Sequence, residues 1–200
     1  MSWKDEQHFE LNWHKSFNFH SYGEETKQIA YATRMGITPQ SLNGKYPIYD
    51  FQNKTVIDIG GGPCSILLKS TNLKKGTVVD PCDYPNWIAQ RYRDAGIEYL
   101  KVMGEELSLD TIYDEAIIYN CLQHVSDPKK IIENAKRISK LIRIFEWIEN
   151  GVSEGHPQNL HSNELDSWLG SIGKAEMINE NGAHGLCYYG IFPTPLYEKI

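Results

Sequence analysis

The fold is decided by the stretch Lys54-Thr55-Val56-Ile57-Asp58-Ile59-Gly60-Gly61-Gly62-Pro63-Cys64-Ser65. A β-branched run ends in an acid, crosses three glycines and enters the apolar segment Ile66-Leu67-Leu68, which predicts a strand, a tight turn and the start of a helix. Three adjacent glycines cost chain entropy unless the backbone needs positive φ angles or a ligand must approach without a Cβ in the way. In a doubly wound sheet such a turn lies where ligands bind.

The charge beside this turn indicates which ligand fits. A dinucleotide would place its pyrophosphate on the N-terminus of the following helix, and Asp58, just before the turn, is expected to face the same crevice. Two like charges about 4 Å apart cost on the order of 4 kcal/mol at an effective dielectric constant of about 20. An acid at this position therefore favours a cationic ligand over a pyrophosphate.

The stretch resembles motif I of the class I S-adenosylmethionine (SAM)-dependent methyltransferases, in which an acid precedes Gly-x-Gly-x-Gly. The resemblance implies that Asp58 and Gly60 to Gly62 bind SAM, which carries an ammonium and a sulfonium and no phosphate, and that S-adenosylhomocysteine is the product. The chain departs from the motif at the third glycine, which is Cys64. It departs from the NAD fingerprint too, since Ser65 replaces the third glycine there.

A second acid, Asp80, follows Asp58 at the sequence spacing expected of a nucleotide-binding βαβ unit. After a short helix and a turn at Lys74-Lys75-Gly76, the run Thr77-Val78-Val79-Asp80 predicts a strand that ends at Pro81. Asp80 lies 22 positions beyond Asp58 (80 − 58), where a βαβ unit delivers an acid to the ribose hydroxyls. A single acid at the end of a strand is as often a turn-forming residue as a ligand-binding one. In the methyltransferase resemblance, Asp80 binds the ribose and Pro81 or its neighbour lies beside the adenine ring.

The next strand is predicted at residues 99–103, after a helix that opens at Tyr84-Pro85-Asn86 and closes at Gly96. The segment Gly104-Glu105-Glu106-Leu107 then resembles the position where methyltransferases meet the adenine edge, which implies that Glu105 binds the cofactor. The alternative is that both glutamates are solvated residues at a helix start.

The N-terminal region is rich in aromatic residues and histidines, and residues 24–35 predict a helix with an acidic first turn that stops at Gly36. In methyltransferases a helix ahead of the first strand commonly lies over the cofactor, so the resemblance makes Tyr22 and Glu25 candidate ligand-facing residues. An ordinary helix packed on the sheet edge is the alternative.

The fourth predicted strand covers residues 113–120, and Asp127-Pro128 then starts a helix. The segment from Tyr119 to Pro128 resembles the corresponding exit of small-molecule methyltransferases, where an apolar strand precedes Leu-x-His-Val and Asp-Pro; Asn120 is expected at the cofactor. The exit differs from the Asn-Pro-Pro-aromatic element of enzymes that methylate DNA bases or protein glutamine. His124 is the candidate general base, and a structural histidine is the alternative.

The last third of the chain is expected to select the methyl acceptor. Residues 141–147 predict a strand with Trp147 at its ligand end, and the long loop 149–161 carries His156 and His161. A short helix capped by Ser162 and stopped by Gly170 follows. Segments 174–179 and 186–192 are expected to form an antiparallel hairpin across Asn181-Gly182.

Composition limits the alternatives. The 20 basic and 26 acidic residues give a net charge of −6 without a Lys/Arg stripe, so no nucleic-acid partner is expected. The apolar runs are too short to span a membrane, and the N-terminus resembles no signal peptide, so the expectation is a cytoplasmic protein. The four cysteines form no Cys-x-x-Cys pair and the histidines do not fall at metal-ligand spacing, so no metal site is expected.

These observations together predict a doubly wound α/β fold of one domain spanning residues 1–200, with a helical cap or lid at 1–45 and a Rossmann-like core at 46–200. The sheet is expected to have seven strands, mostly parallel, with an antiparallel C-terminal hairpin and helices on both faces. The implied function is SAM-dependent methyl transfer to an O, N or C nucleophile of a small molecule, by a monomer or homodimer. Two alternatives remain: an NAD(P)-dependent reductase, and a non-catalytic SAM- or nucleotide-binding module.

Overall fold

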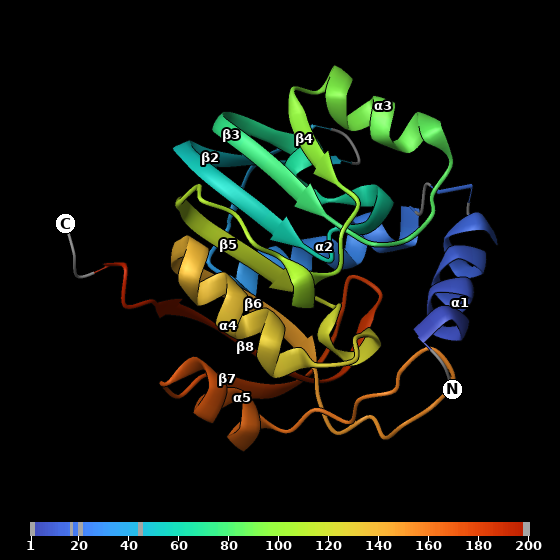
Figure 1. The fold of residues 1–200 in the computed structure, drawn as a ribbon, viewed down its shortest axis with the longest axis vertical. Helices are drawn as coiled ribbons and strands as arrows, with labels where there is room; N and C mark the ends of the chain where they lie inside the picture. The colour runs from blue at the N-terminus through green and yellow to red at the C-terminus, as the bar shows by residue number, and fades with distance from the viewer. Residues whose placement is uncertain (1–2, 17, 20–21, 44–45, 198–200) are drawn as a thin grey trace.

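A computed structural model describes residues 3–16, 18–19, 22–43 and 46–197. One mixed sheet forms its centre (Figure 1). Its strands are β1 (Pro39–Asn43), β2 (Tyr46–Ile59), β3 (Ser70–Val79), β4 (Ile97–Leu100), β5 (Tyr113–Tyr119), β6 (Ser139–Trp147), β7 (Lys174–Glu180) and β8 (Ala183–Pro193). The helices are α1 (Trp3–Ser16), α2 (Tyr22–Arg34), α3 (Asn86–Asp94), α4 (Pro128–Ile138) and α5 (Ser162–Leu169), and 3₁₀ turns lie at Gly62–Cys64, Ile66–Lys69, Gly104–Glu106 and Leu122–His124.

The sheet order confirms the predicted fold class. Seven strands run in the order β4-β3-β2-β5-β6-β8-β7, and β1 adds a short antiparallel eighth strand along β2. The five strands from β4 to β6 are parallel, whereas β8 is antiparallel to both β6 and β7. The hairpin turns at Asn181 and Gly182, whose φ angles of +50° and +77° suit a two-residue β-turn.

Helices cover both faces of the sheet because its strands alternate between two cores. Val56 and Ile117 point into one core with Tyr31 of α2 and Ile88 of α3. Their sequence neighbours, such as Ile57, point into the other core, which α4 and α5 close. Most side chains of the central strand β5 and the last four of β3 are thus buried on one face or the other, as in a parallel sheet covered on both sides.

The connection between β2 and β3 differs from the expectation. No α-helix follows the glycine turn; the chain makes two 3₁₀ turns and enters β3 at Ser70. The predicted turn at Lys74-Lys75-Gly76 is therefore wrong, because these residues lie inside β3, where Lys75 pairs with Thr55 and Gly76 with Val56. Ser162 also begins α5 without capping it, since the N-cap position belongs to His161.

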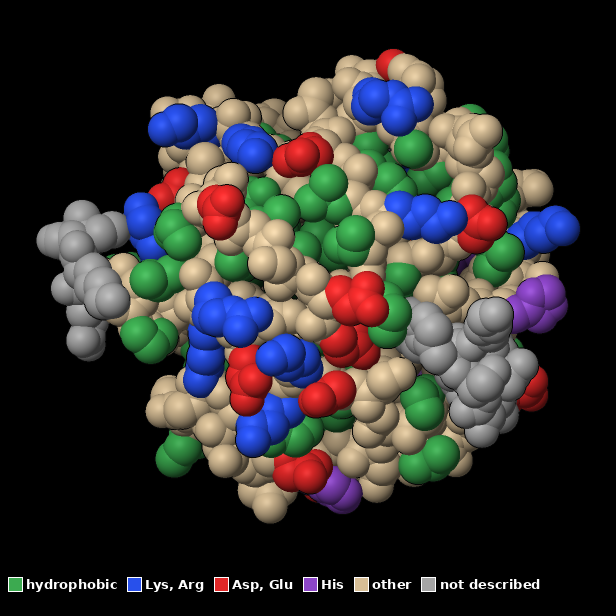
Figure 2. Space-filling model, in the orientation of Figure 1, with side chains coloured by type: hydrophobic (Ala, Val, Ile, Leu, Met, Phe, Trp, Pro, Cys, Tyr) green, Lys and Arg blue, Asp and Glu red, His purple; other side chains and the backbone are tan. Residues whose placement is uncertain are grey.

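The arrowheads of the parallel strands point toward the side of the molecule where α1 lies (Figure 1). No helix of the described residues is long and apolar enough to cross a bilayer. On the face shown in Figure 2, Lys and Arg side chains are interspersed with Asp and Glu instead of forming one continuous basic area.

Candidate active site

A cavity of about 590 Å³ opens at the carboxyl ends of the central parallel strands. Its floor comes from the residues that follow β2, β3 and β5, namely Gly60, Asp80 and Asn120. α1 contributes Glu10, Trp13 and His14 to the wall, α2 contributes Lys27, Gln28 and Tyr31, and the turn of the β7–β8 hairpin contributes Gly182, Ala183 and His184. The cavity lies where doubly wound sheets bind their ligands.

The three glycines at the cavity edge are each required by geometry. Gly60 and Gly62 have φ angles of +79° and +57°, which side-chain-bearing residues rarely adopt. A Cβ on Gly60 would come within 2.5 Å of the Cβ of Cys121, and one on Gly61 within 2.7 Å of the Asp58 carboxylate. A Cβ on Gly62 would lie in ordinary contact, 3.7 Å, with His14 and Tyr84 on the cavity wall, so it is the φ angle that favours glycine there.

Asp58 lies beneath this turn and does not reach the cavity. Its side chain is fully buried, Oδ2 accepts a hydrogen bond from the Ser65 hydroxyl at 2.5 Å, and Oδ1 has no partner among the described residues. Burial raises the pKa of Asp58 to about 7, and the nearby charge of Asp80 acts in the same direction. The expectation that this carboxylate faces the crevice is therefore wrong; it supports the glycine turn from behind.

Asp80 holds the turn from the neighbouring strand. Oδ2 accepts the backbone N–H of Gly62 and Oδ1 that of Cys82, each at 3.0 Å. Burial raises the pKa of Asp80 to about 6 against these hydrogen bonds, so the carboxylate is mostly ionised at pH 7. Asp80, Pro81 and Cys82 all line the cavity.

Side chains from α2 and α3 hydrogen-bond to the backbone around Cys64, where the chain departs from the glycine motif. The amide of Gln28 donates to the carbonyl oxygen of Cys64 at 2.6 Å. The Tyr92 hydroxyl accepts the N–H of Ser65 and donates to the carbonyl oxygen of Gly62, at 3.0 and 2.7 Å. The turn is thus held in one conformation although its third motif position bears a side chain.

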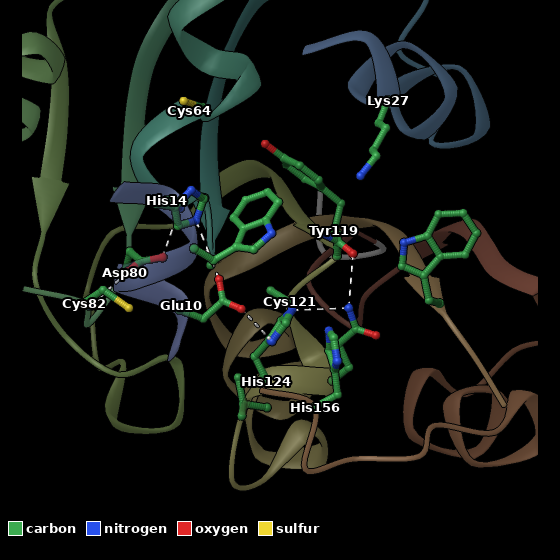
Figure 3. Close-up of a pocket in the computed structure, with 18 of the residues that line it drawn as sticks. Glu10, His14, Lys27, Cys64, Asp80, Cys82, Tyr119, Cys121, His124 and His156 are labelled. Atoms are coloured by element: carbon green, nitrogen blue, oxygen red, sulfur yellow. Dashed lines mark hydrogen bonds and ion pairs between the residues drawn. The ribbon is translucent and has the colours of Figure 1, made fainter. Parts of the chain in front are cut away.

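Three histidines of the cavity wall, His14, His124 and His156, lie near one another. The His124 ring, in the 3₁₀ turn after β5, lies 4.6 Å from the His156 ring and 3.0 Å from the Glu10 carboxylate of α1. Glu10 lies between His124 and His14, the latter at 3.7 Å (Figure 3). Burial lowers the pKa of His14 to about 4, and the charge of His124 adds to this shift, so His14 is neutral near pH 7.

Trp147, the last residue of β6, forms a rigid aromatic wall of the cavity. Its indole makes edge-on contacts with Tyr31 and Phe145, at centroid distances of 6.1 and 5.2 Å. The backbone of Gly185 approaches the indole so closely that an added Cβ would lie 3.2 Å from it. Packing on these sides fixes the orientation of the ring.

Comparison with known proteins rests on structure. No family model and no curated protein sequence matches the chain. A possible histamine N-methyltransferase from Thermotoga maritima matches at a TM-score of 0.59 and 17% identity, over 96% of this chain and 98% of the other. The N-methyltransferase NodS from Bradyrhizobium japonicum, solved with S-adenosylhomocysteine, matches at 0.55 and 14% identity, over 71% and 79%. The chain has the fold of the SAM-dependent methyltransferases.

Within this methyltransferase fold, nine predicted site residues lie together around the cavity. They are Gly60, Gly61, Gly62, Asp80, Pro81, Asn120, His124, Trp147 and His156. They come from the ends of four adjacent strands and the loop after β6, so residues far apart in sequence meet because parallel strands share one carboxyl edge.

Two further predicted residues, Glu105 and His161, lie away from the described cavity wall. The Glu105 carboxylate accepts the backbone N–H groups of Ser126 and Asp127 at 3.0 and 3.2 Å, and it is absent from the described cavity wall. His161 is exposed beside Asn159, also away from that wall. Tyr22 begins α2, but its side chain lies outside the described residues, as does that of Glu25.

The contribution of α1 was not predicted, because the sequence indicated only a region rich in aromatic residues and histidines without metal-ligand spacing. Glu10, Trp13 and His14 are spaced at i, i+3 and i+4 and therefore lie on one face of a helix, the face that lines the cavity. This spacing was the feature of the sequence that could have indicated a functional helix face. Tyr84, which also lines the cavity, carried no comparable sign.

Proposed function

We propose that the protein is a SAM-dependent methyltransferase that acts on a small-molecule acceptor. The observation that carries the proposal is the pairing of the glycine turn with Asp80 at the cavity edge. The Asp80 carboxylate receives the two backbone N–H groups and a side-chain hydrogen bond from Cys82, so of its four acceptor positions one remains that can receive a ribose hydroxyl. The solved NodS structure, which shares the fold, holds S-adenosylhomocysteine.

The residues around the cavity fit this cofactor. Gly60 to Gly62 would cradle it without side chains in the way, and Pro81, Cys82 and Tyr84 offer apolar surface for a base. Net anionic character at this end, from Asp80 and Glu10, suits a ligand that carries a sulfonium. When bound, the cofactor supplies an electrophilic methyl group.

The other half of the cavity is assigned to the acceptor. Trp147 provides a fixed aromatic surface, while His124 and His156 provide groups that can exchange protons near neutral pH. α1 and the loop after β6 line this half, so positioning and desolvation of a bound acceptor would supply most of the catalysis. His124 takes a proton only where the acceptor needs deprotonation.

The geometry disfavours a dinucleotide-dependent reductase. Such enzymes bind the pyrophosphate at the N-terminus of the helix that follows the glycine turn. Here the turn is followed by 3₁₀ segments of three and four residues and then by β3. The structure therefore offers no α-helix N-terminus at that place.

Catalysis is tested by label transfer. The protein is incubated with SAM labelled at the methyl group and a pool of metabolites below about 1 kDa, and labelled products are identified by mass spectrometry. The expected result is a labelled small molecule together with S-adenosylhomocysteine. Binding of SAM without transfer to any compound would support the non-catalytic module instead.

A further inference from the structure

The contacts of His124 fix which ring nitrogen carries its proton. Nδ1 lies 2.5 Å from the carbonyl oxygen of Gly155 and 3.0 Å from the carboxylate of Glu10, and both groups are acceptors. Nε2 lies 3.2 Å from the side-chain nitrogen of Gln123, which is a donor. The neutral ring therefore bears its proton on Nδ1 and presents a lone pair at Nε2.

Glu10 reaches His124 from a different part of the chain. It belongs to α1, which contacts the loop after β6. At this contact the ring of Phe9 in α1 lies over Gly155 of the loop, and a Cβ on that glycine would come within 2.3 Å of the ring. The Glu10 side chain is 21% exposed and the His124 side chain 16%, so solvent screens their interaction only in part. Glu10 and His124 meet only when α1 lies over the cavity.

We infer that Glu10 is a positioning residue for His124, and that docking of α1 completes the proton-accepting group of the site. This inference rests on the proposed function. The nucleophilic atom of the acceptor takes the methyl group from the sulfonium, whose sulfur keeps the bonding electron pair, and Nε2 takes the acceptor's proton. The acceptor's O–H or N–H replaces the Gln123 amide at Nε2, and Glu10 balances the imidazolium charge that forms.

The other titratable groups facing His124 do not substitute for Glu10. His14 of α1 is neutral near pH 7 because burial lowers its pKa to about 4. His156, from the loop after β6, lies beside the ring at an interplanar angle of 43° and, as a histidine, is either neutral or positively charged. Among these described neighbours, Glu10 supplies the anionic charge that stabilises a protonated His124.

The inference is tested by nitrogen NMR of the histidine rings in the free, full-length protein. The signals of His124 are assigned by their loss in His124→Asn. Spectra recorded across pH 5–9 then give its tautomer and its pKa in the wild type, in Glu10→Gln and in Glu154→Gln. Glu154→Gln is the matched control, because Glu154 is an exposed glutamate in the loop after β6, next to Gly155, and does not line the described cavity.

We expect the Nδ1–H tautomer in the wild type, a His124 pKa about one unit lower in Glu10→Gln, and no change beyond about 0.2 units in Glu154→Gln. A predominant Nε2–H tautomer in the wild type, or equal pKa values in the wild type and Glu10→Gln, would overturn the inference. Where Glu10→Gln detaches α1, the wild-type tautomer still tests the inference, because a predominant Nε2–H tautomer overturns it. The spectra need neither cofactor nor acceptor, so a parallel titration with S-adenosylhomocysteine reports failure of the proposed function separately.

Discussion

The carboxylate of Asp80 accepts the backbone N–H of Gly62 at 3.0 Å and so ties the tip of β3 to the glycine turn that follows β2. The second oxygen of the same carboxylate holds the chain at Cys82. One buried acid thereby shapes both sides of the cavity edge and faces the space between them. Under the proposed function, Asp80 would combine this structural support with binding of the cofactor.

Asp80→Ala is expected to weaken binding of S-adenosylhomocysteine by roughly 1.5–3 kcal/mol, or about 10- to 150-fold in Kd, because a hydrogen bond to a charged acceptor is lost. Stability should also fall, by about 1–3 kcal/mol, since two backbone N–H groups lose their acceptor. Calorimetric titration and urea unfolding measure the two effects. Asp83→Ala is the control, since Asp83 is exposed and pairs with Lys101 at the surface; equal affinity in all three proteins would reduce Asp80 to a turn residue.

Gly61→Ala is expected to destabilise the protein by about 1–3 kcal/mol through overpacking. The φ angle of Gly61 is −70°, so alanine suits the backbone and the cost comes from the added Cβ, 2.7 Å from Asp58 Oδ2. A double-mutant cycle with Asp58→Ala isolates this contact. Unfolding experiments should show that Gly61→Ala costs less in the Asp58→Ala background; strictly additive effects would contradict the placement of Asp58 beneath the turn.

Stability should fall as pH rises from about 5 to 8. Burial raises the pKa of Glu146 to about 8 and that of Asp58 to about 7, so each binds a proton in the folded state that it has already lost in the unfolded state at these pH values. Their contribution is complete below the unfolded pKa of about 4 and is lost as pH rises through the folded pKa. Two groups act oppositely. Burial lowers the pKa of His14 to about 4, so its contribution is lost as pH falls below its unfolded pKa of about 6.5 and partly offsets the trend there. Hydrogen bonds lower the pKa of Asp114 to about 2 against its partial burial, so its contribution is lost only in acid.

Glu146→Gln isolates the contribution of Glu146 to this pH dependence of stability. The glutamine does not titrate, but its side-chain oxygen can still accept the N–H groups of Cys121 and Leu122. Urea unfolding at several pH values should show a slope shallower by roughly 1 kcal/mol per pH unit than that of the wild type. Glu133→Gln, at an exposed site on α4, serves as the control. Identical slopes in the wild type and Glu146→Gln would show that Glu146 is ionised in the folded protein.

His124→Asn is expected to leave the affinity for S-adenosylhomocysteine within about twofold and to lower turnover by roughly 10²- to 10⁴-fold, the contribution of a general base. The measurement follows identification of the acceptor by label transfer. His161→Asn is the matched control, since that ring is exposed and away from the described cavity wall. Wild-type turnover at pH 7 in His124→Asn would remove this residue from the mechanism.

Local patterns predicted the elements that depend on local chemistry. Asp127 accepts the N–H of Lys130 and Pro128 starts α4, as the sequence indicated. The Asn181-Gly182 pair adopts two positive φ angles and joins β7 to β8, also as predicted. In each case two or three adjacent residues supply the required geometry.

The region after the glycine turn depends on distant partners, and there the prediction fails. β2 extends back to Tyr46, and Tyr49 pairs with Ser70, so the chain is drawn into β3 where a helix was expected. Asp50 supports the irregular part of this pairing by accepting hydrogen bonds from the backbone of Gln52 and the side chain of Asn72. A local pattern carries no information about such cross-strand contacts.

The site was predictable where it follows strand ends, and less so elsewhere. Asp80 and Asn120 follow directly from the predicted strands, because parallel strands end at one edge. Asp58 was wrongly expected in the crevice because it lies close to the glycine turn in the sequence. Strand alternation puts it on the same face of β2 as Val56 and on the opposite face from Ile57. The position of Glu10 depends on how α1 docks, which is set by tertiary contacts such as that of Phe9 with Gly155.

The central claim, that the cavity binds SAM, is tested most directly by thermal unfolding of the wild type with SAM, S-adenosylhomocysteine, NAD or NADP. A ligand at about 100 times its Kd adds about 2.7 kcal/mol of stability, which corresponds to a rise in Tm of roughly 5–10 °C for a chain of this size. The account predicts such a rise with SAM and S-adenosylhomocysteine and no rise with NAD or NADP. A rise with NAD or NADP alone would contradict it.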